Sequence, residues 1–177
     1  MTRALAVAAV IAAAAPPAHA DDGTRDTVVS TQVWAAFTRG LSLQGEHRVA
    51  PHLSVVIEGG LRGGALGDYS STTWMLGADL RWWFRPRGPV AIAGPYLAAH
   101  ASAGRTSLVM SATGDGLGTS WGLEQRADVG WRFTIRGRVA LTPSLGVGTH
   151  EDLDGRGRLA PTTRSSIAVG LELGCLL

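Results

Sequence analysis

The chain has 177 residues, enough for one domain, and its formal net charge of +2 is too small to indicate a polyanionic partner. Its basic residues are all arginines and lie singly along the sequence, so nucleic acid is not an expected partner. Cys175 is the single cysteine, which excludes an internal disulfide, and no metal-ligand spacing surrounds it. We therefore expect neither a metal nor a cofactor.

The N-terminal residues have the features of a secretory signal peptide. Arg3 gives a positive start, an apolar stretch follows, and Ala18-His19-Ala20 matches the A-x-A cleavage pattern. The apolar stretch is shorter than the ~20 residues of a spanning helix, which disfavours a retained membrane anchor. The expected organisation is a signal peptide over 1–20, a short periplasmic lead over 21–26 and one domain over 27–177.

Alternation of apolar and polar residues predicts strands through the first half of the domain. The strand over 73–85 places Trp74, Leu76, Leu80, Trp82 and Phe84 on one face. The predicted strands of this half cover 27–33, 41–49, 53–62 and 73–85, with a turn at 50–52, a longer polar loop at 63–71 and a tight connection at 86–89.

The second half is organised around a strand over 121–136. Its odd positions run from Trp121 to Ile135 and are apolar except for Gln125, whereas its even positions are polar, charged or glycine. The strand over 90–105 alternates poorly, and Pro95 predicts a bulge or distortion there. The other predicted features are an extension at 107–110, a glycine-rich loop at 113–119, a tight turn at 136–138, a strand at 139–148, a polar loop at 151–161 and a closing strand at 167–175 that carries Cys175 on its apolar face.

These strands predict a closed barrel. Seven are clear, and single-chain bacterial barrels use even numbers, so residues 27–33 are expected to supply the eighth and residues 34–40 its outer connection. Short connections near 50, 87 and 137 alternate with long ones near 67, 116 and 156, as in outer-membrane barrels. The expected fold is therefore all-β, an eight-stranded antiparallel up-and-down transmembrane β-barrel.

Aromatic residues ten positions apart bracket the apolar faces of two strands, Trp121 and Trp131 on one and Trp74 and Phe84 on the other. A tilted strand of ten residues spans roughly the 25 Å apolar band of such a barrel, and indole rings favour the lipid headgroup level. The alternative is a soluble periplasmic β-barrel or sandwich with its tryptophans packed inside. The expected aromatic girdle consists of Trp74, Trp82, Phe84, Trp121, Trp131 and Phe133.

Charged residues occupy the opposite, inward positions. Their signs nearly cancel, and confined ions must be paired, so we expect an arginine–carboxylate network that plugs the lumen. An ion path or catalytic pair at Glu58, Asp79 or Glu124 is less favoured, because such networks usually fill small barrels. The expected network is Glu46, Arg48, Glu58, Arg62, Asp79, Arg81, Glu124, Arg126, Asp128, Arg132 and Glu172.

The signal peptide, the bracketed strands and the Gly45-Glu46 pair after Leu43, with its inward carboxylate, resemble the small outer-membrane β-barrel proteins of the OmpA, OmpX and OmpW-like group. The resemblance covers residues 27–177. It implies a Gram-negative cell envelope, a porin-like barrel in the outer membrane, contact with outer-membrane lipid and insertion by the barrel-assembly machinery. Members of the group typically end on an aromatic residue, whereas this chain ends Cys175-Leu176-Leu177.

Three functions remain open. The first is a non-enzymatic, monomeric outer-membrane protein with a role in envelope structure or surface contact. The second is a lipid-modifying enzyme: outer-membrane lipid A deacylases carry a His-x-Ser pair, and His100 and Ser102 have that spacing. No carboxylate follows at close range in the sequence, so polar residues at the outer end of a strand are the favoured interpretation. The third is a narrow channel or small-ligand carrier.

Overall fold

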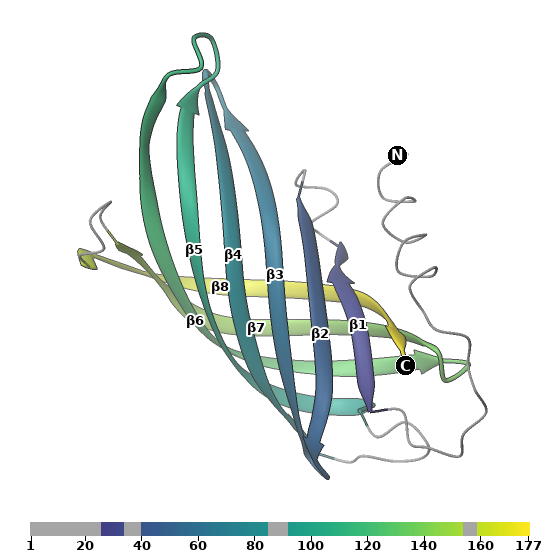
Figure 1. Ribbon diagram of the computed structural model, residues 1–177. Helices are drawn as coiled ribbons and strands as arrows, with labels where there is room; N and C mark the ends of the chain where they lie inside the picture. Colours follow the sequence, from purple (N-terminus) through teal and green to yellow (C-terminus); the bar gives the residue numbers. More distant parts are fainter. Residues whose placement is uncertain (1–25, 34–39, 85–91, 154–158) are drawn as a thin grey trace.

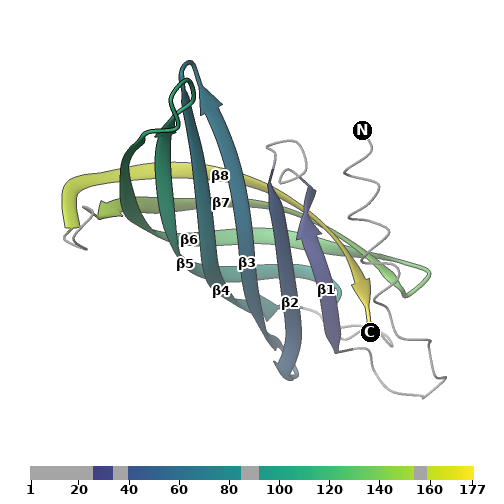
Figure 2. The same cartoon turned by 45° about the horizontal axis from the view of Figure 1, so that its top comes forward.

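The computed structural model describes residues 26–33, 40–84, 92–153 and 159–177. They form eight strands that close into one barrel in chain order, each antiparallel to its neighbours. In Figures 1 and 2, β1 to β4 run steeply along one wall while β7 and β8 cross the other, as tilted barrel strands do. The strands are β1 (Thr27–Gln32), β2 (Leu41–Ala50), β3 (Leu53–Leu66), β4 (Tyr69–Trp83), β5 (Gly94–Met110), β6 (Gly116–Ile135), β7 (Val139–Leu153) and β8 (Leu159–Leu176).

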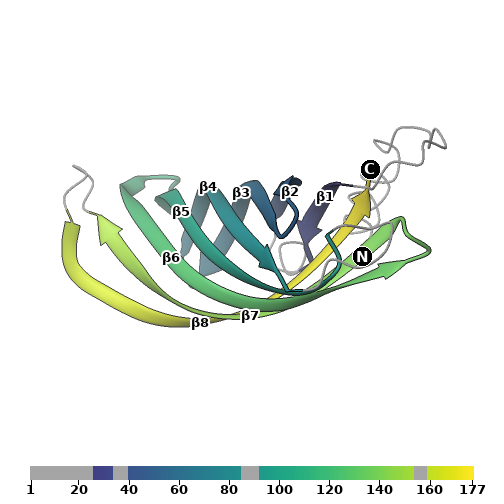
Figure 3. The ribbon, with the colours of Figure 1, turned by 90° about the horizontal axis from the view of Figure 1, so that it is seen from below.

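The first strand closes the barrel. β1 pairs with β8 from Val28 opposite Leu176 to Gln32 opposite Glu172, and its other edge pairs with β2. Figure 3, seen from below, places β1 beside the end of β8. The eight-stranded antiparallel up-and-down barrel is therefore confirmed, including the strand inferred from parity alone.

The burial pattern is the reverse of that in a soluble protein. On β6, Trp131 is 48% exposed, whereas its neighbour Arg132 is 1% exposed. The same alternation on β4 leaves Trp82 at 51% and Arg81 at 2%. The soluble alternative required the tryptophans to be packed inside, and the structure places Trp74, Trp82, Trp121 and Trp131 on the outer surface.

The turn between β6 and β7 forms as expected. Arg136 and Gly137 have φ values of 52° and 63°, and the Arg138 amide donates to the Ile135 carbonyl at 3.1 Å. Positive φ at both central residues is what a type I′ hairpin turn requires, and glycine adopts it without steric cost.

Three expected long loops are shorter than predicted, because backbone pairing continues beyond the apolar band. β3 and β4 pair up to Leu66 opposite Tyr69, so the expected loop over 63–71 is a turn at Gly67 and Asp68. β6 already begins at Gly116, inside the expected loop over 113–119, and β7 continues to Leu153. Ladder hydrogen bonds need no apolar side chains, so the loss of alternation did not mark the strand ends. Figure 1 shows the β3–β4 and β5–β6 hairpins projecting together at one end of the barrel.

The expected distortion at Pro95 is also wrong. Pro95 lies opposite Trp131 in regular register, and the only register shift between β5 and β6 falls at Leu108 and Val109. Pro95 is the second residue of β5, and its carbonyl accepts a hydrogen bond from the Phe84 amide at 3.1 Å. A proline near the start of a strand costs the ladder little.

Several expectations lie outside the described residues. These are the signal peptide over 1–20, most of the lead over 21–26, nearly all of the connection over 34–40 and the tight connection over 86–89. Among the described residues, no helix is long and apolar enough to cross a membrane.

Candidate functional site

A layer of packed apolar side chains, here called the apolar layer, lies in the lumen at the end of the barrel where the described chain begins and ends. Val28, Trp83, Ile92, Tyr96, Ala140 and Leu176 pack there, each 5% exposed or less. The Trp83 and Tyr96 rings lie 5.0 Å apart between centroids. Both occupy inward positions of β4 and β5, so they fill the lumen instead of joining the outer girdle.

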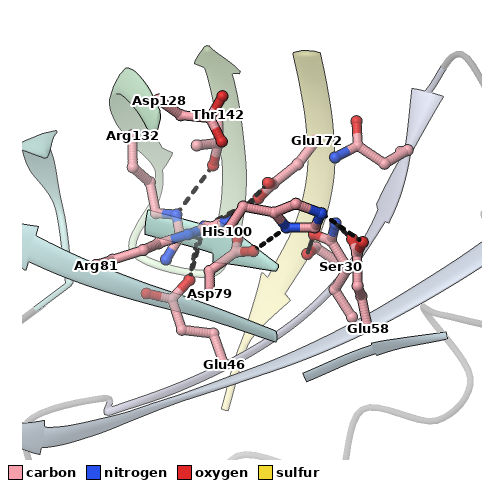
Figure 4. A network of polar contacts seen from close by, with 12 residues as sticks. Ser30, Glu46, Glu58, Asp79, Arg81, His100, Asp128, Arg132, Thr142 and Glu172 are labelled. Carbon is pink, nitrogen blue, oxygen red and sulfur yellow. Dashed lines mark hydrogen bonds and ion pairs between the residues drawn. The ribbon is translucent and has the colours of Figure 1, made fainter. Parts of the chain in front are cut away.

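Arg81 is the centre of the ionic layer above these aromatic rings. Its guanidinium donates to Glu46 at 3.0 Å, to Asp79 at 3.0 Å and to Glu172 at 2.6 Å (Figure 4). These carboxylates come from β2, β4 and β8, so Arg81 joins strands on both sides of the barrel closure. All four side chains are at most 5% exposed.

Arg132 completes the layer from β6. Its guanidinium donates to Glu46 at 2.6 Å and to the Thr142 hydroxyl at 2.9 Å, and it lies 3.6 Å from Glu172. The two guanidinium carbons also lie over aromatic rings, Arg132 over Trp83 at 5.1 Å and Arg81 over Tyr96 at 5.0 Å. Cation–π contact adds to the ion pairs where water is excluded.

Besides Arg81 and Arg132, Ser54 also binds Glu46. The Trp83 indole donates to the Ser54 hydroxyl at 2.8 Å, and that hydroxyl donates to Glu46 at 2.5 Å. Hydrogen bonds of this kind are what make a buried carboxylate tolerable. The apolar and ionic layers are thereby connected through Trp83.

His100 joins two further carboxylates in the middle of the barrel. Its Nδ1 lies 2.5 Å from Asp79, and its Nε2 lies 3.6 Å from Glu58 with no hydrogen-bond partner. Gln44 donates to the other oxygen of Glu58 at 2.8 Å. In Figure 4 the imidazole lies between Asp79 and Glu58.

A second ionic group lies along β6. The Arg126 Nε donates to both oxygens of Asp128, at 2.7 and 2.9 Å, and its Nη1 donates to Glu124 at 2.7 Å. One guanidinium therefore serves two carboxylates. Arg126 and Glu124 remain partly exposed, whereas Asp128 is buried.

A cavity of about 500 Å³ lies beside these two groups. Arg81, Tyr96 and Glu172 line it from the closed end, and Glu58, Arg126 and Asp128 line it further along. Arg62 and His150 border both this cavity and a smaller one of about 120 Å³. The side chains therefore do not fill the whole lumen. The described residues contain no group of three or more histidine, cysteine or acidic side chains suited to hold a metal ion.

The structure brings most of the expected network together, but not all of it. Nine of the eleven residues lie in the two ionic groups or on the Glu58–His100 contact: Glu46, Glu58, Asp79, Arg81, Glu124, Arg126, Asp128, Arg132 and Glu172. Arg48 instead pairs at 3.4 Å with Asp26, a partly exposed contact. Arg62 is exposed and makes no ion pair within the described part of the chain. The near-cancellation of charge therefore fails in the buried region, where carboxylates outnumber arginines.

His100 and Ser102 do not lie where the sequence interpretation put them. His100 is 4% exposed and faces the lumen. In the sheet it lies opposite Asp79 of β4 and opposite Arg126 of β6, well inside β5 rather than at its outer end. The carboxylate that contacts His100 does not follow it in the sequence but comes from the neighbouring strand, as Asp79 of β4. Ser102 faces the same side and borders the smaller cavity, but no hydrogen bond links it to His100.

The six expected girdle residues all lie on the outer surface, between 43% and 58% exposed. Trp74 and Trp121 flank Arg105 across three adjacent strands at one level. Trp82, Phe84, Trp131 and Phe133 lie towards the closed end, where Trp131 and Phe133 stack with centroids 6.0 Å apart. Exposed aliphatic residues such as Ile57, Leu76 and Val129 lie between the two levels.

Sequence reasoning missed Trp83 and Tyr96, and it named His100 only as a possible catalytic residue and not as part of the ionic network. The alternation of residues along the strand places Trp83 on the inward face. An aromatic residue at an inward position was the feature of the sequence that could have identified it. Tyr96 and His100 share that face with Ala98, but poor alternation in β5 hid it.

Comparison with known proteins gives one kind of match. No protein-family model and no curated protein matches the chain. Among solved structures, the crystal structure of Neisserial surface protein A (NspA) is similar with a TM-score of 0.52 and 15% identity over 86% of this chain and 94% of that one. NspA is an eight-stranded β-barrel, and at this identity the likeness supports the fold alone.

Proposed function

We propose that this protein is an integral outer-membrane β-barrel, closed at the end near its termini, that acts without catalysis through envelope structure or surface contact. The observation that carries the proposal is the reversed polarity of the wall. Tryptophans and aliphatic residues are exposed outside, while Arg81, Arg132 and their carboxylates are buried inside. In water this arrangement exposes a large apolar band, whereas in a bilayer it exposes almost none.

The signal peptide, the outer-membrane location and insertion by the barrel-assembly machinery belong to the same proposal. Support comes from the similarity in fold to NspA, which is named as a surface protein. In this arrangement the termini lie on the periplasmic side, and the projecting β3–β4 and β5–β6 hairpins form the outer contact surface. We assign the protein as a monomer, because the closed barrel leaves no unpaired strand at the β1–β8 joint.

Cell fractionation tests the location directly. The protein should remain with outer membranes after a high-pH wash and dissolve only in detergent. A folded barrel should also migrate differently on gels before and after boiling. Recovery in the soluble periplasmic fraction without detergent would overturn the proposal.

A closed lumen would also prevent ion conductance, which can be tested separately. The Arg81 and Arg132 ion pairs and the apolar layer beneath them block the passage, so purified protein in planar bilayers should show no conductance steps. Regular single-channel steps that a refolded sample reproduces would favour the channel over the plugged barrel.

The enzymatic alternative is tested by His100→Ala. Because His100 lies inside the lumen and away from the lipid-facing surface, lipid A from cells with this variant should be unchanged. A loss of lipid modification in the variant, restored by the unmodified chain, would establish the enzyme instead.

A further inference from the structure

The cavity in the lumen has an unbalanced lining. Three guanidinium groups border it, those of Arg62, Arg81 and Arg126. The bordering carboxylates are Glu58, Asp79, Glu124, Asp128 and Glu172, two more than the guanidiniums. Glu46 and Arg132 behind them cancel one another, and His100 and His150 carry charge only when protonated. Counted by permanently charged groups alone, the lining of the cavity therefore has two more negative than positive side chains.

Glu58 is where the imbalance is most local. It is 7% exposed, and among the described residues no arginine lies within ion-pair distance of it. Its partners are the neutral amide of Gln44 and the His100 Nε2 at 3.6 Å. A buried carboxylate without a permanent cation is costly, so this position favours an added positive group.

Tyr96 supplies an independent observation. It is 2% exposed and lines the cavity, and its hydroxyl makes no hydrogen bond within the described part of the chain. The ring lies over Gly130, where a Cβ would come within 2.4 Å of the hydroxyl oxygen and the adjacent ring carbon. Buried hydroxyl groups in proteins normally have a hydrogen-bond partner, so the Tyr96 hydroxyl beside this cavity is available to bond a ligand.

We propose that this cavity binds a small organic cation, an amine or guanidinium compound, with its charged group against Glu58 and the Tyr96 hydroxyl as a further polar contact. A volume of about 500 Å³ suits a small molecule. The ligand enters from the end bordered by Arg62 and His150, because the apolar layer closes the other end. This inference goes beyond the proposed function and does not depend on the cellular location of the barrel.

The test is isothermal titration of the full protein, purified in detergent, with 1,4-diaminobutane and with methylguanidine. The matched neutral compound is 1,4-butanediol, which has the size of the diamine but no charge. The protein should bind at least one of the two cations and not the diol. Failure of both cations to bind, or equal binding of the diol, would overturn the proposal.

Variants locate the site. Glu58→Gln keeps the side-chain shape, removes the charge and should weaken cation binding about tenfold, since hydrogen bonds to charged groups are the stronger class. Tyr96→Phe keeps the ring and should also weaken binding. Arg62→Gln removes a like charge from the entrance and should strengthen binding.

Glu151→Gln is the control, because it makes the same chemical change on the outer face of β7, away from the cavity. Its affinity should equal that of the unmodified protein. Heat-modifiable migration shows that each variant is folded. Folded Glu58→Gln protein that binds the cation as tightly as the unmodified chain would contradict the assignment.

Discussion

Arg81 shows what a single residue must satisfy inside this barrel. A buried guanidinium is stable only with several acceptors, and Arg81 finds them on Glu46, Asp79 and Glu172. The alternation of apolar and polar residues correctly predicted that Arg81 faces inward. It could not predict the partners, because Glu172 lies 91 positions away and the contact depends on how β8 closes against β1.

Replacing Arg81 tests the ionic layer at this scale. Arg81→Met leaves Glu46 and Glu172 with Arg132 as their remaining guanidinium and leaves Asp79 with His100, so we expect a loss of about 3–5 kcal/mol in the free energy of unfolding. Urea unfolding in lipid vesicles or detergent, followed by tryptophan fluorescence, measures it. The matched control, Arg62→Met, removes an exposed arginine without an ion pair in the described chain and should stay within about 0.5 kcal/mol. Equal effects of the two variants would show that the ion pairs do not stabilise the barrel.

At the scale of the strand, alternation was a good guide to orientation and a poor guide to length. β4 and β6 follow the expected faces residue by residue. Their ends continue past Trp74 and Trp121 into the projecting hairpins, where both faces are polar or glycine-rich and the period of two no longer carries information. Pairing of backbone groups decides strand length there, and the sequence does not display it.

The outer face of β3 supports a second prediction. Ile57 is 62% exposed and pairs with Ala78, midway between Trp74 and Trp82 on β4. In a bilayer Ile57→Arg places a charge near the midplane and should cost about 2–4 kcal/mol. Ser70→Arg, on the outward face of β4 beyond Trp74, should cost about 0–1 kcal/mol. Unfolding in vesicles measures both, and a cost for Ile57→Arg no larger than for Ser70→Arg would place this wall outside lipid.

The contact between Tyr96 of β5 and Gly130 of β6 supports a third prediction. A Cβ on Gly130 would lie 2.4 Å from the Tyr96 ring, so Gly130→Ala must displace Tyr96 and should cost about 1–3 kcal/mol of unfolding free energy. Gly59→Ala meets nothing within 4 Å and is the control, with a change of no more than about 0.5 kcal/mol. Fluorescence from Trp83, which contacts Tyr96, should change in the first variant and not in the second.

At the scale of the whole molecule, the eight amphipathic strands close into a barrel whose outer wall is apolar and whose interior is charged. The strand count and wall polarity could be predicted from the sequence, because both follow from the period of two and from the need to pair every strand. The unfilled cavity could not, since it depends on which inward side chains share a level. The buried excess of carboxylates was also hidden, because Arg48 and Arg62 entered the sequence count but lie outside the buried network.

The measurement that tests the reversed polarity most directly is fluorescence quenching by lipids brominated at chosen depths, in variants that retain one tryptophan each. Trp74 and Trp131, exposed on the outer wall, should be quenched most strongly by bromines near the headgroups. Trp83, which is 1% exposed inside the lumen, should be quenched weakly at every depth. Strong quenching of Trp83 together with no quenching of Trp74 and Trp131 would contradict the account.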